Sequence, residues 1–144
     1  MQRERKYIHM IKLLIGVKGT GKTKTLIESA NVALNETKGY VVCLEKGTKL
    51  RSNINYKVRL INTDDYLIDD ASALGGMVAG IIAGNSDVTD LFIDSALKIC
   101  GNDLAAFDKF LTDLAKVTEN NPTKITMTVS LAVEDATETI KKFI

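Results

Sequence analysis

A strand, a glycine-rich turn and a helix follow one another near the start of the chain, and they constrain the fold most strongly. The apolar run Ile11–Ile15 has the length and composition of a buried strand. Gly16, Gly19 and Gly21 then interrupt any regular element. Between Lys22 and Asn35 the apolar residues recur at helical spacing: Leu26, Ile27, Ala30, Ala33 and Leu34. A buried strand that leads into an amphipathic helix is typical of an α/β fold.

The rest of the chain repeats this alternation of strands and helices. Further strands are predicted at Tyr40–Leu44, Lys57–Ile61, Leu91–Ile93 and Ile125–Ala132. Further helices are predicted at Ala71–Gly84, Leu104–Val117 and Glu134–Phe143. Lys38 and Gly39 are expected to end the first helix, and Asp69 or Asp70 to begin the second. We therefore predict one α/β domain at residues 10–144, a three-layer fold with a five-stranded, mainly parallel sheet flanked by helices.

Three glycines in the second predicted helix, Gly76, Gly80 and Gly84, recur every four residues and so share one helix face. Close packing of this face against the sheet is the favoured interpretation. A surface for self-association is the alternative, since small residues let two helices approach closely.

The glycine-rich turn satisfies the pattern G-x-x-x-x-G-K-[ST] in full and has the strand before it and the helix after it that the pattern requires. Its residues are Gly16, Val17, Lys18, Gly19, Thr20, Gly21, Lys22 and Thr23, followed by Lys24. Glycine lets backbone N–H groups approach an anion closely, and the helix N-terminus adds favourable potential. Lys22 can then contact the β- and γ-phosphates, and the Thr23 hydroxyl can bind Mg²⁺.

These residues reproduce the Walker A motif, and the chain resembles the P-loop NTPase superfamily. The segment Leu91-Phe92-Ile93-Asp94 is similar to a Walker B strand. The resemblance implies ATP and Mg²⁺ as ligands, with Asp94 and Thr23 on the metal side. It extends over nearly all of residues 10–144 and points to small stand-alone bacterial ATP-binding proteins. Two strands predicted between the motifs indicate the class that has additional strands there.

Residues for hydrolysis are harder to find. Fast ATPases of that class often carry glutamate directly after the Walker B aspartate, where this chain has Ser95. Glu45, which follows the second strand as in RecA-like ATPases, is our first choice to orient the attacking water, so the catalytic candidates are Lys22, Glu45 and Asp94. Asp64 and Asp65 are alternatives. A solvated acid at a strand end is the commoner interpretation of each of these three carboxylates.

Two further positions are possible contacts of the γ-phosphate. Outside the first nine residues the only arginines are Arg51 and Arg59, and Arg51 is a possible arginine finger, although a solvated loop cation is the more common case. Ser130, near the carboxyl end of the last strand, could sense the γ-phosphate. An ordinary polar contact of Thr128 or Ser130 with a helix is the equally favoured alternative.

Composition limits the remaining possibilities. The 19 basic residues nearly balance the 18 acidic ones, so bulk charge does not indicate nucleic acid binding. Cys43 and Cys100 lie in or beside apolar runs and are predicted to be buried thiols, and the single histidine, His9, makes a Cys/His metal site unfavourable. The absence of a signal sequence or a bilayer-spanning run predicts a cytoplasmic protein.

The first nine residues differ in character from the domain. The segment MQRERKYIH is polar and basic, and we expect it to be a tail that is not native, with Met10 as the natural start. A native basic arm is the alternative.

Three functions remain open on the sequence. The favoured one is an ATP-binding switch or accessory protein with slow or partner-stimulated hydrolysis, acting with a protein partner or by self-association. The second is a small phosphotransferase resembling kinases of the thymidine kinase type. The third is a non-enzymatic interaction module that nucleotide stabilises.

Overall fold

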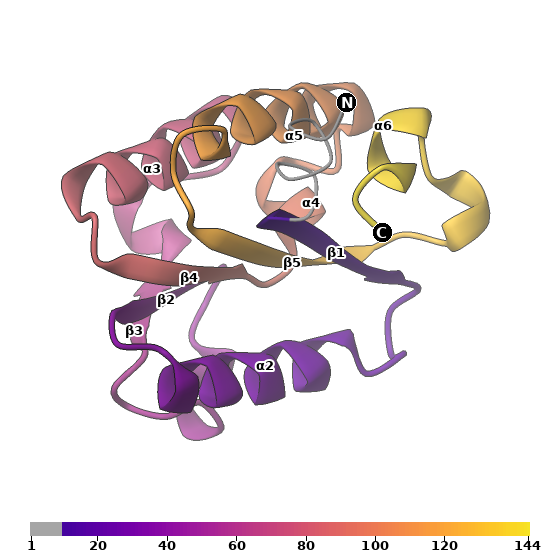
Figure 1. Ribbon diagram of the computed structural model, residues 1–144. Coiled ribbons are helices and arrows are strands. Elements are labelled where there is room, and N and C mark those ends of the chain that lie inside the picture. Colours follow the sequence, from indigo (N-terminus) through magenta and orange to yellow (C-terminus); the bar gives the residue numbers. More distant parts are fainter. Residues whose placement is uncertain (1–9) are drawn as a thin grey trace.

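In the computed structural model, which describes residues 10–144, five parallel strands form one sheet in the order β1-β5-β4-β2-β3 (Figure 1). The strands are β1 (Ile11–Gly16), β2 (Tyr40–Glu45), β3 (Arg59–Asn62), β4 (Val88–Ile93) and β5 (Lys124–Ser130). The predicted α/β fold with a parallel five-stranded sheet is confirmed. β5 ends two residues earlier than predicted and β3 starts two residues later. The basic tail lies outside the described residues.

Helices cover both faces of the sheet. α3 (Ala71–Gly84), α4 (Ala96–Ile99), α5 (Leu104–Thr118) and α6 (Glu138–Lys141) lie on one face, and α2 (Lys22–Glu36) lies on the other (Figure 1). Three short 3₁₀ helices connect the larger elements: η1 (Lys49–Ser52), η2 (Thr63–Tyr66) and η3 (Val133–Asp135). None of the helices in residues 10–144 combines the length and the apolar character that crossing a lipid bilayer requires.

Alternation along the strands divides the apolar core into two clusters. In β4, Leu91 and Ile93 face α3 and α5, whereas Phe92 between them faces α2. The cluster beneath α2 also contains residues of the η1 segment, notably Leu50 and Ile54. Each large side chain that is fully buried contributes roughly 1.5–3 kcal/mol, so both faces stabilise the sheet.

The prediction of one closing helix at Glu134–Phe143 is wrong. The segment forms η3 and then α6, with Ala136 between them in an extended conformation. The Thr137 hydroxyl accepts from Ile140 N and donates to Asp108 Oδ1 at 2.7 Å. Threonine in this position is an N-cap, so a tertiary hydrogen bond and a cap together end one helical turn and start another.

The two helix boundaries that we predicted have different outcomes. Asp70 begins α3 as expected, because its carboxylate accepts from Ala73 N at 2.7 Å. α2, however, ends at Glu36 with Thr37 as its C-cap, so Lys38 and Gly39 do not terminate it. Gly39 is needed for close approach instead, since a Cβ there would collide with the carbonyl oxygen of Asp87.

The glycine face of α3 does not pack against the sheet, contrary to the favoured interpretation. Gly76, Gly80 and Gly84 are exposed, and a Cβ added to any of them would meet no atom within 4 Å. Gly75 is the glycine that faces α5, since a Cβ added there would lie 3.7 Å from Phe110 Cδ1. Self-association through the exposed face stays a prediction.

Candidate functional site

The carboxyl ends of four neighbouring strands bring the polar candidates together. Gly16 at the end of β1 pairs with Ser130 at the end of β5, and Glu45 ends β2 beside the position where Asp94 follows β4. The chain leaves β1 and β2 toward the α2 face, but it leaves β4 and β5 toward the opposite face (Figure 1). Ligands of parallel α/β sheets bind where connections diverge in this way.

The loop between β1 and α2 has the geometry of an anion site. Gly19 and Gly21 adopt left-handed conformations, with φ of 88° and 83°, which side chains with a Cβ adopt only at a cost. Gly21 is the N-cap of α2, and no side chain caps the helix there. The first turn of α2 also contains no acidic residue. Its N–H groups and the positive end of the helix dipole are therefore left for a ligand.

The loop holds its lysine in place. Lys22 Nζ donates to the Val17 carbonyl oxygen at 2.9 Å and lies 3.4 Å from Thr20 Oγ1. Thr20 Oγ1 donates to the same carbonyl at 2.8 Å. A Cβ at Gly16 would come within 2.8 Å of Thr20 Oγ1, so glycine is required there for close packing. The ammonium group thus lies over the loop before any ligand is present.

Two threonines hold the Asp94 carboxylate. Asp94 Oδ1 accepts from Thr23 Oγ1 at 3.1 Å and from Thr128 Oγ1 at 2.8 Å. Thr128 is buried and accepts from the backbone N–H of Ser95 at 2.7 Å. Ser95 adopts φ 57°, a conformation that non-glycine residues seldom adopt and that is frequent at functional sites. A hydroxyl and a carboxylate, both hard oxygen ligands, therefore lie side by side next to the glycine loop.

A cavity of about 420 Å³ connects these groups. The predicted site residues that line it are Lys18, Gly19, Gly21, Lys22, Thr23, Lys24, Glu45 and Asp94. Six lysines and only two acidic residues line this space, although the net charge of the chain is +1. The resulting positive potential favours a polyanionic ligand of a size that such a cavity can hold.

Sequence reasoning missed three of these lysines. Lys46 and Lys49 come from the segment between β2 and β3, and Lys98 comes from α4. Lys46 and Lys49 lie in a polar stretch and Lys98 lies between Leu97 and Ile99, so no local pattern marks them and only the fold places them at the cavity. Thr128 carried a weak signal, since it was a polar residue on a strand, but its bond to Asp94 depends on β5 lying beside β4.

Glu45 is in the predicted place but has a role that we did not foresee. Its side chain is only 3% exposed, and Oε1 accepts from Lys49 N at 2.6 Å and from Leu50 N at 3.0 Å. It therefore caps η1. The other carboxylate oxygen, Oε2, is buried and has no hydrogen-bond partner among the described residues. Glu45 also lines the cavity, and Oε2 is the carboxylate oxygen that no group of the described residues contacts by a hydrogen bond.

The other predicted polar residues divide between two places. Ser130 lines the cavity, as does Ser95. Asp64 pairs with Lys46 at 2.6 Å, on η2. Asp65 and Arg51 line a different hollow, along β3, and are not among the residues that line the lysine-rich cavity.

Both cysteines are buried and unpaired, as predicted. Burial raises the pKa of the Cys43 thiol, and the charges of Asp94 and Glu45 raise it further. Burial also raises the pKa of Cys100, to about 12, with smaller contributions from Asp70 and Asp103. Both groups stay protonated at neutral pH, which makes them poor nucleophiles. Within residues 10–144, no cluster of three His, Cys, Asp or Glu side chains could hold a metal by itself.

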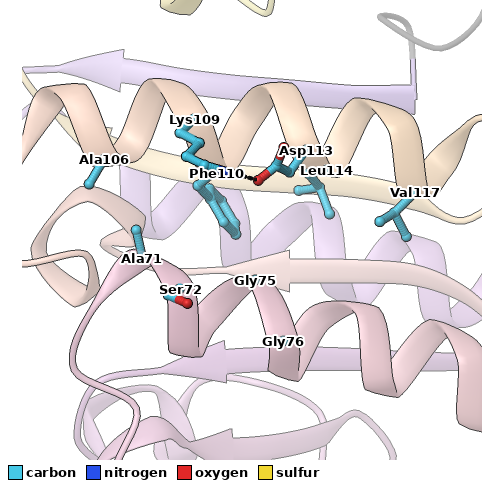
Figure 2. A pocket seen from close by; sticks show the side chains of 10 residues that line it. All are labelled: Ala71, Ser72, Gly75, Gly76, Ala106, Lys109, Phe110, Asp113, Leu114 and Val117. Carbon is cyan, nitrogen blue, oxygen red and sulfur yellow. Dashed lines mark hydrogen bonds and ion pairs between the residues drawn. The ribbon is translucent and has the colours of Figure 1, made fainter.

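A second hollow, between α3 and α5, has a different character. Figure 2 shows Phe110 pointing between the helices, with Ala71, Leu114 and Val117 around it. The charged groups there, Lys109 and Asp113, bind each other at 2.7 Å. The hydrogen bond from Lys109 lowers the pKa of Asp113. An apolar groove whose charges are already paired offers no group to recognise a phosphate.

No protein-family model matches the chain, and no curated protein matches its sequence.

Proposed function

We propose that the chain binds ATP with Mg²⁺ at the loop formed by residues 16–24. One observation carries this proposal: Thr23 Oγ1 lies 3.1 Å from Asp94 Oδ1, across 71 positions of sequence, beside the lysine-lined cavity. A hydroxyl that begins a helix and a carboxylate at a strand end match the Walker A and Walker B motifs in their relative position. In the sheet, β5 lies between β1, which leads into the Walker A-like loop, and β4, which ends just before Asp94. This order supports the class that has an additional strand between the strands of the two motifs.

Each part of the loop has a role in this proposal. The N–H groups of the first turn of α2 would bind the phosphates, and Lys22 would exchange the Val17 carbonyl for phosphate oxygens. Thr23 and Asp94 would hold Mg²⁺, which takes its remaining ligands from phosphate and water. The metal would supply neutralisation of the phosphate charge. Thr128 would keep the Asp94 carboxylate oriented through its bond to Oδ1.

Slow or partner-stimulated hydrolysis is the most consistent activity. Ser95 stands where a fast ATPase of this class carries glutamate, and the cations around the cavity are lysines. Glu45 is the available carboxylate. Its free Oε2 could accept a proton from an attacking water or orient that water, while Oε1 stays bonded to η1. In this proposal Glu45 Oε2 would act on the water without a second catalytic side chain. Such a site fits a switch or accessory protein better than a rapid enzyme.

Nucleotide binding is tested with Lys22→Ala, using Lys38→Ala as the matched control because Lys38 is exposed and lies away from the cavity. Isothermal titration with Mg·ATP should show binding by the wild type and the control. Lys22→Ala should bind at least about tenfold more weakly, because a charge-assisted hydrogen bond contributes roughly 1.5–3 kcal/mol. Removing Mg²⁺ with EDTA should weaken wild-type binding. Wild-type protein that fails to bind ATP, ADP and GTP would overturn the proposal.

A further inference from the structure

The free edge of the sheet at β3 lies in a groove that the nucleotide proposal does not use. β3 is the last strand in the sheet order and pairs only with β2 among the described strands. The hollow along it has a volume of about 560 Å³. In a parallel ladder, alternate backbone N–H and C=O groups point away from the neighbouring strand, so the outer edge of β3 presents unpaired groups to this hollow.

The groove is basic. Arg51, Lys57 and Arg59 line it and are exposed, and Asp65 is the only acidic residue among those that line it. Both arginines of residues 10–144 are thus at this edge. Arginine is enriched in protein–protein interfaces, where its planar group binds carboxylates with two hydrogen bonds.

Exposed apolar side chains flank the strand at both ends. Tyr56, which precedes β3, is 88% exposed, and Tyr66, which follows it, is 55% exposed. Both line the groove. Leu67, next to Tyr66, is 85% exposed and adopts a left-handed conformation with φ 60°. Tyrosine beside arginine around a desolvated centre is the composition typical of binding hot spots.

We propose that this edge binds an extended, acidic peptide segment of a partner protein, which adds to the sheet as a sixth strand beside β3. The unpaired backbone groups would hold the segment by main-chain hydrogen bonds. Arg51, Lys57 and Arg59 would pair with its carboxylates, and the two tyrosines would cover its ends. The proposal does not depend on nucleotide binding.

Other occupants use fewer of these features. A second copy paired edge to edge about a twofold axis would bring together two grooves that each carry Arg51, Lys57 and Arg59 with a single acidic residue, and the like charges of the two copies would repel. A single-stranded nucleic acid could stack on Tyr56 and Tyr66, but it has no backbone that pairs in register with β3. An acidic peptide strand meets the charge, the main-chain groups and the apolar ends together.

The probe is a fluorescein-labelled peptide in which glutamates alternate with valines. Fluorescence anisotropy should show binding that weakens with salt, and amide resonances of β3 should shift in NMR spectra. The same peptide with lysines in place of glutamates should not bind. A version methylated on alternate backbone nitrogens keeps the charge but cannot pair with a strand, so it should lose at least about tenfold in affinity.

Variants locate the site on the protein. Arg59→Glu and Tyr56→Ala should each weaken peptide binding, the charge reversal by at least about tenfold, whereas Lys38→Glu should leave it unchanged. Tyr56 is almost fully exposed, so its removal tests the groove even if Arg59→Glu destabilises the edge strand, and circular dichroism reports whether each variant folds. Absence of binding, equal binding of the methylated peptide, or tighter binding of an oligo-deoxythymidine would each overturn the proposal.

Discussion

Glu45 combines two possible roles, and two substitutions distinguish them. Its Oε1 fixes the start of η1 through Lys49 N and Leu50 N, while Oε2 is buried without a partner. Glu45→Gln keeps the shape and an oxygen that can accept both N–H groups. Glu45→Ala removes that oxygen and leaves two N–H groups without their acceptor.

The expected effects on stability differ accordingly. In Glu45→Ala the Leu50 N–H is buried and that of Lys49 is partly buried. An unsatisfied buried donor costs roughly 1–3 kcal/mol, so this variant should lose about 2–5 kcal/mol of unfolding free energy. Glu45→Gln exchanges one unpartnered polar atom for another and should lose no more than about 1 kcal/mol.

The assays are urea unfolding, ATP binding and phosphate release, with Glu36→Gln as the matched control because Glu36 is exposed at the end of α2. If Glu45 orients water, Glu45→Gln should release phosphate about a hundredfold more slowly than the wild type, while its ATP affinity changes little. Hydrolysis by Glu45→Gln at the wild-type rate would refute the catalytic role and leave the structural one. Loss of less than about 1 kcal/mol in Glu45→Ala would refute the structural role.

Three further predictions address the support of the site and the fold. Thr128→Val should cost about 1–3 kcal/mol of stability and weaken Mg²⁺-dependent ATP binding about tenfold or more. Thr126→Val is the control on the same strand, because the Thr126 hydroxyl makes no hydrogen bond within residues 10–144. It should have neither effect, and equal effects of the two variants in urea unfolding and titration would contradict this. Gly39→Ala should lower the melting temperature, because the added Cβ would collide with the Asp87 backbone. Gly80→Ala lies on the open surface of α3 and should raise stability by about 0.5–1 kcal/mol. The reverse order of the two variants in thermal melts would refute the close contact between Gly39 and Asp87. The pKa of Cys100 is raised from 9.0 to about 12 in the folded chain, so the unfolded chain loses the thiol proton at lower pH. The contribution of the protonated thiol to stability is therefore complete below pH 9 and is lost as the pH rises toward 12. Unfolding free energies measured across about pH 8–11 should decline less steeply with pH in Cys100→Ala than in the wild type, and identical slopes would contradict the assignment.

The sheet and the loop could be predicted because their signals are local. Ile11–Ile15 is a mostly apolar run followed by glycine, Leu91–Ile93 is an apolar run with an aspartate on either side, and both form strands. The prediction of one helix at Glu134–Phe143 was wrong because the helix is interrupted at Thr137, whose hydroxyl donates a hydrogen bond to Asp108 on α5. A side-chain bond across 29 positions leaves no trace in a periodicity.

The candidate site was only half predictable for the same reason. Thr23 and Asp94 belong to patterns that can be read along the chain, and the fold brings them together. Lys98 and Thr128 depend on which strands are neighbours, and the order β1-β5-β4-β2-β3 does not follow from the order of the elements in sequence. The prediction that the glycine face of α3 packs against the sheet was wrong, because a repeat of four residues identifies a helix face but not what that face contacts.

The lysine-lined cavity and the β3 groove share η1 as a wall. Lys49 and Leu50 line the cavity, and Arg51, the next residue, lines the groove. Glu45 holds the first two of these by their N–H groups. A peptide that binds Arg51 would therefore contact the element that Glu45 caps, and a nucleotide in the cavity would lie beside Lys49 and Leu50 of the same element. If a peptide and a nucleotide each bind one arrangement of η1 more tightly than another, each should change the binding affinity for the other by the same factor, and titration of one ligand at a saturating concentration of the other would measure that factor.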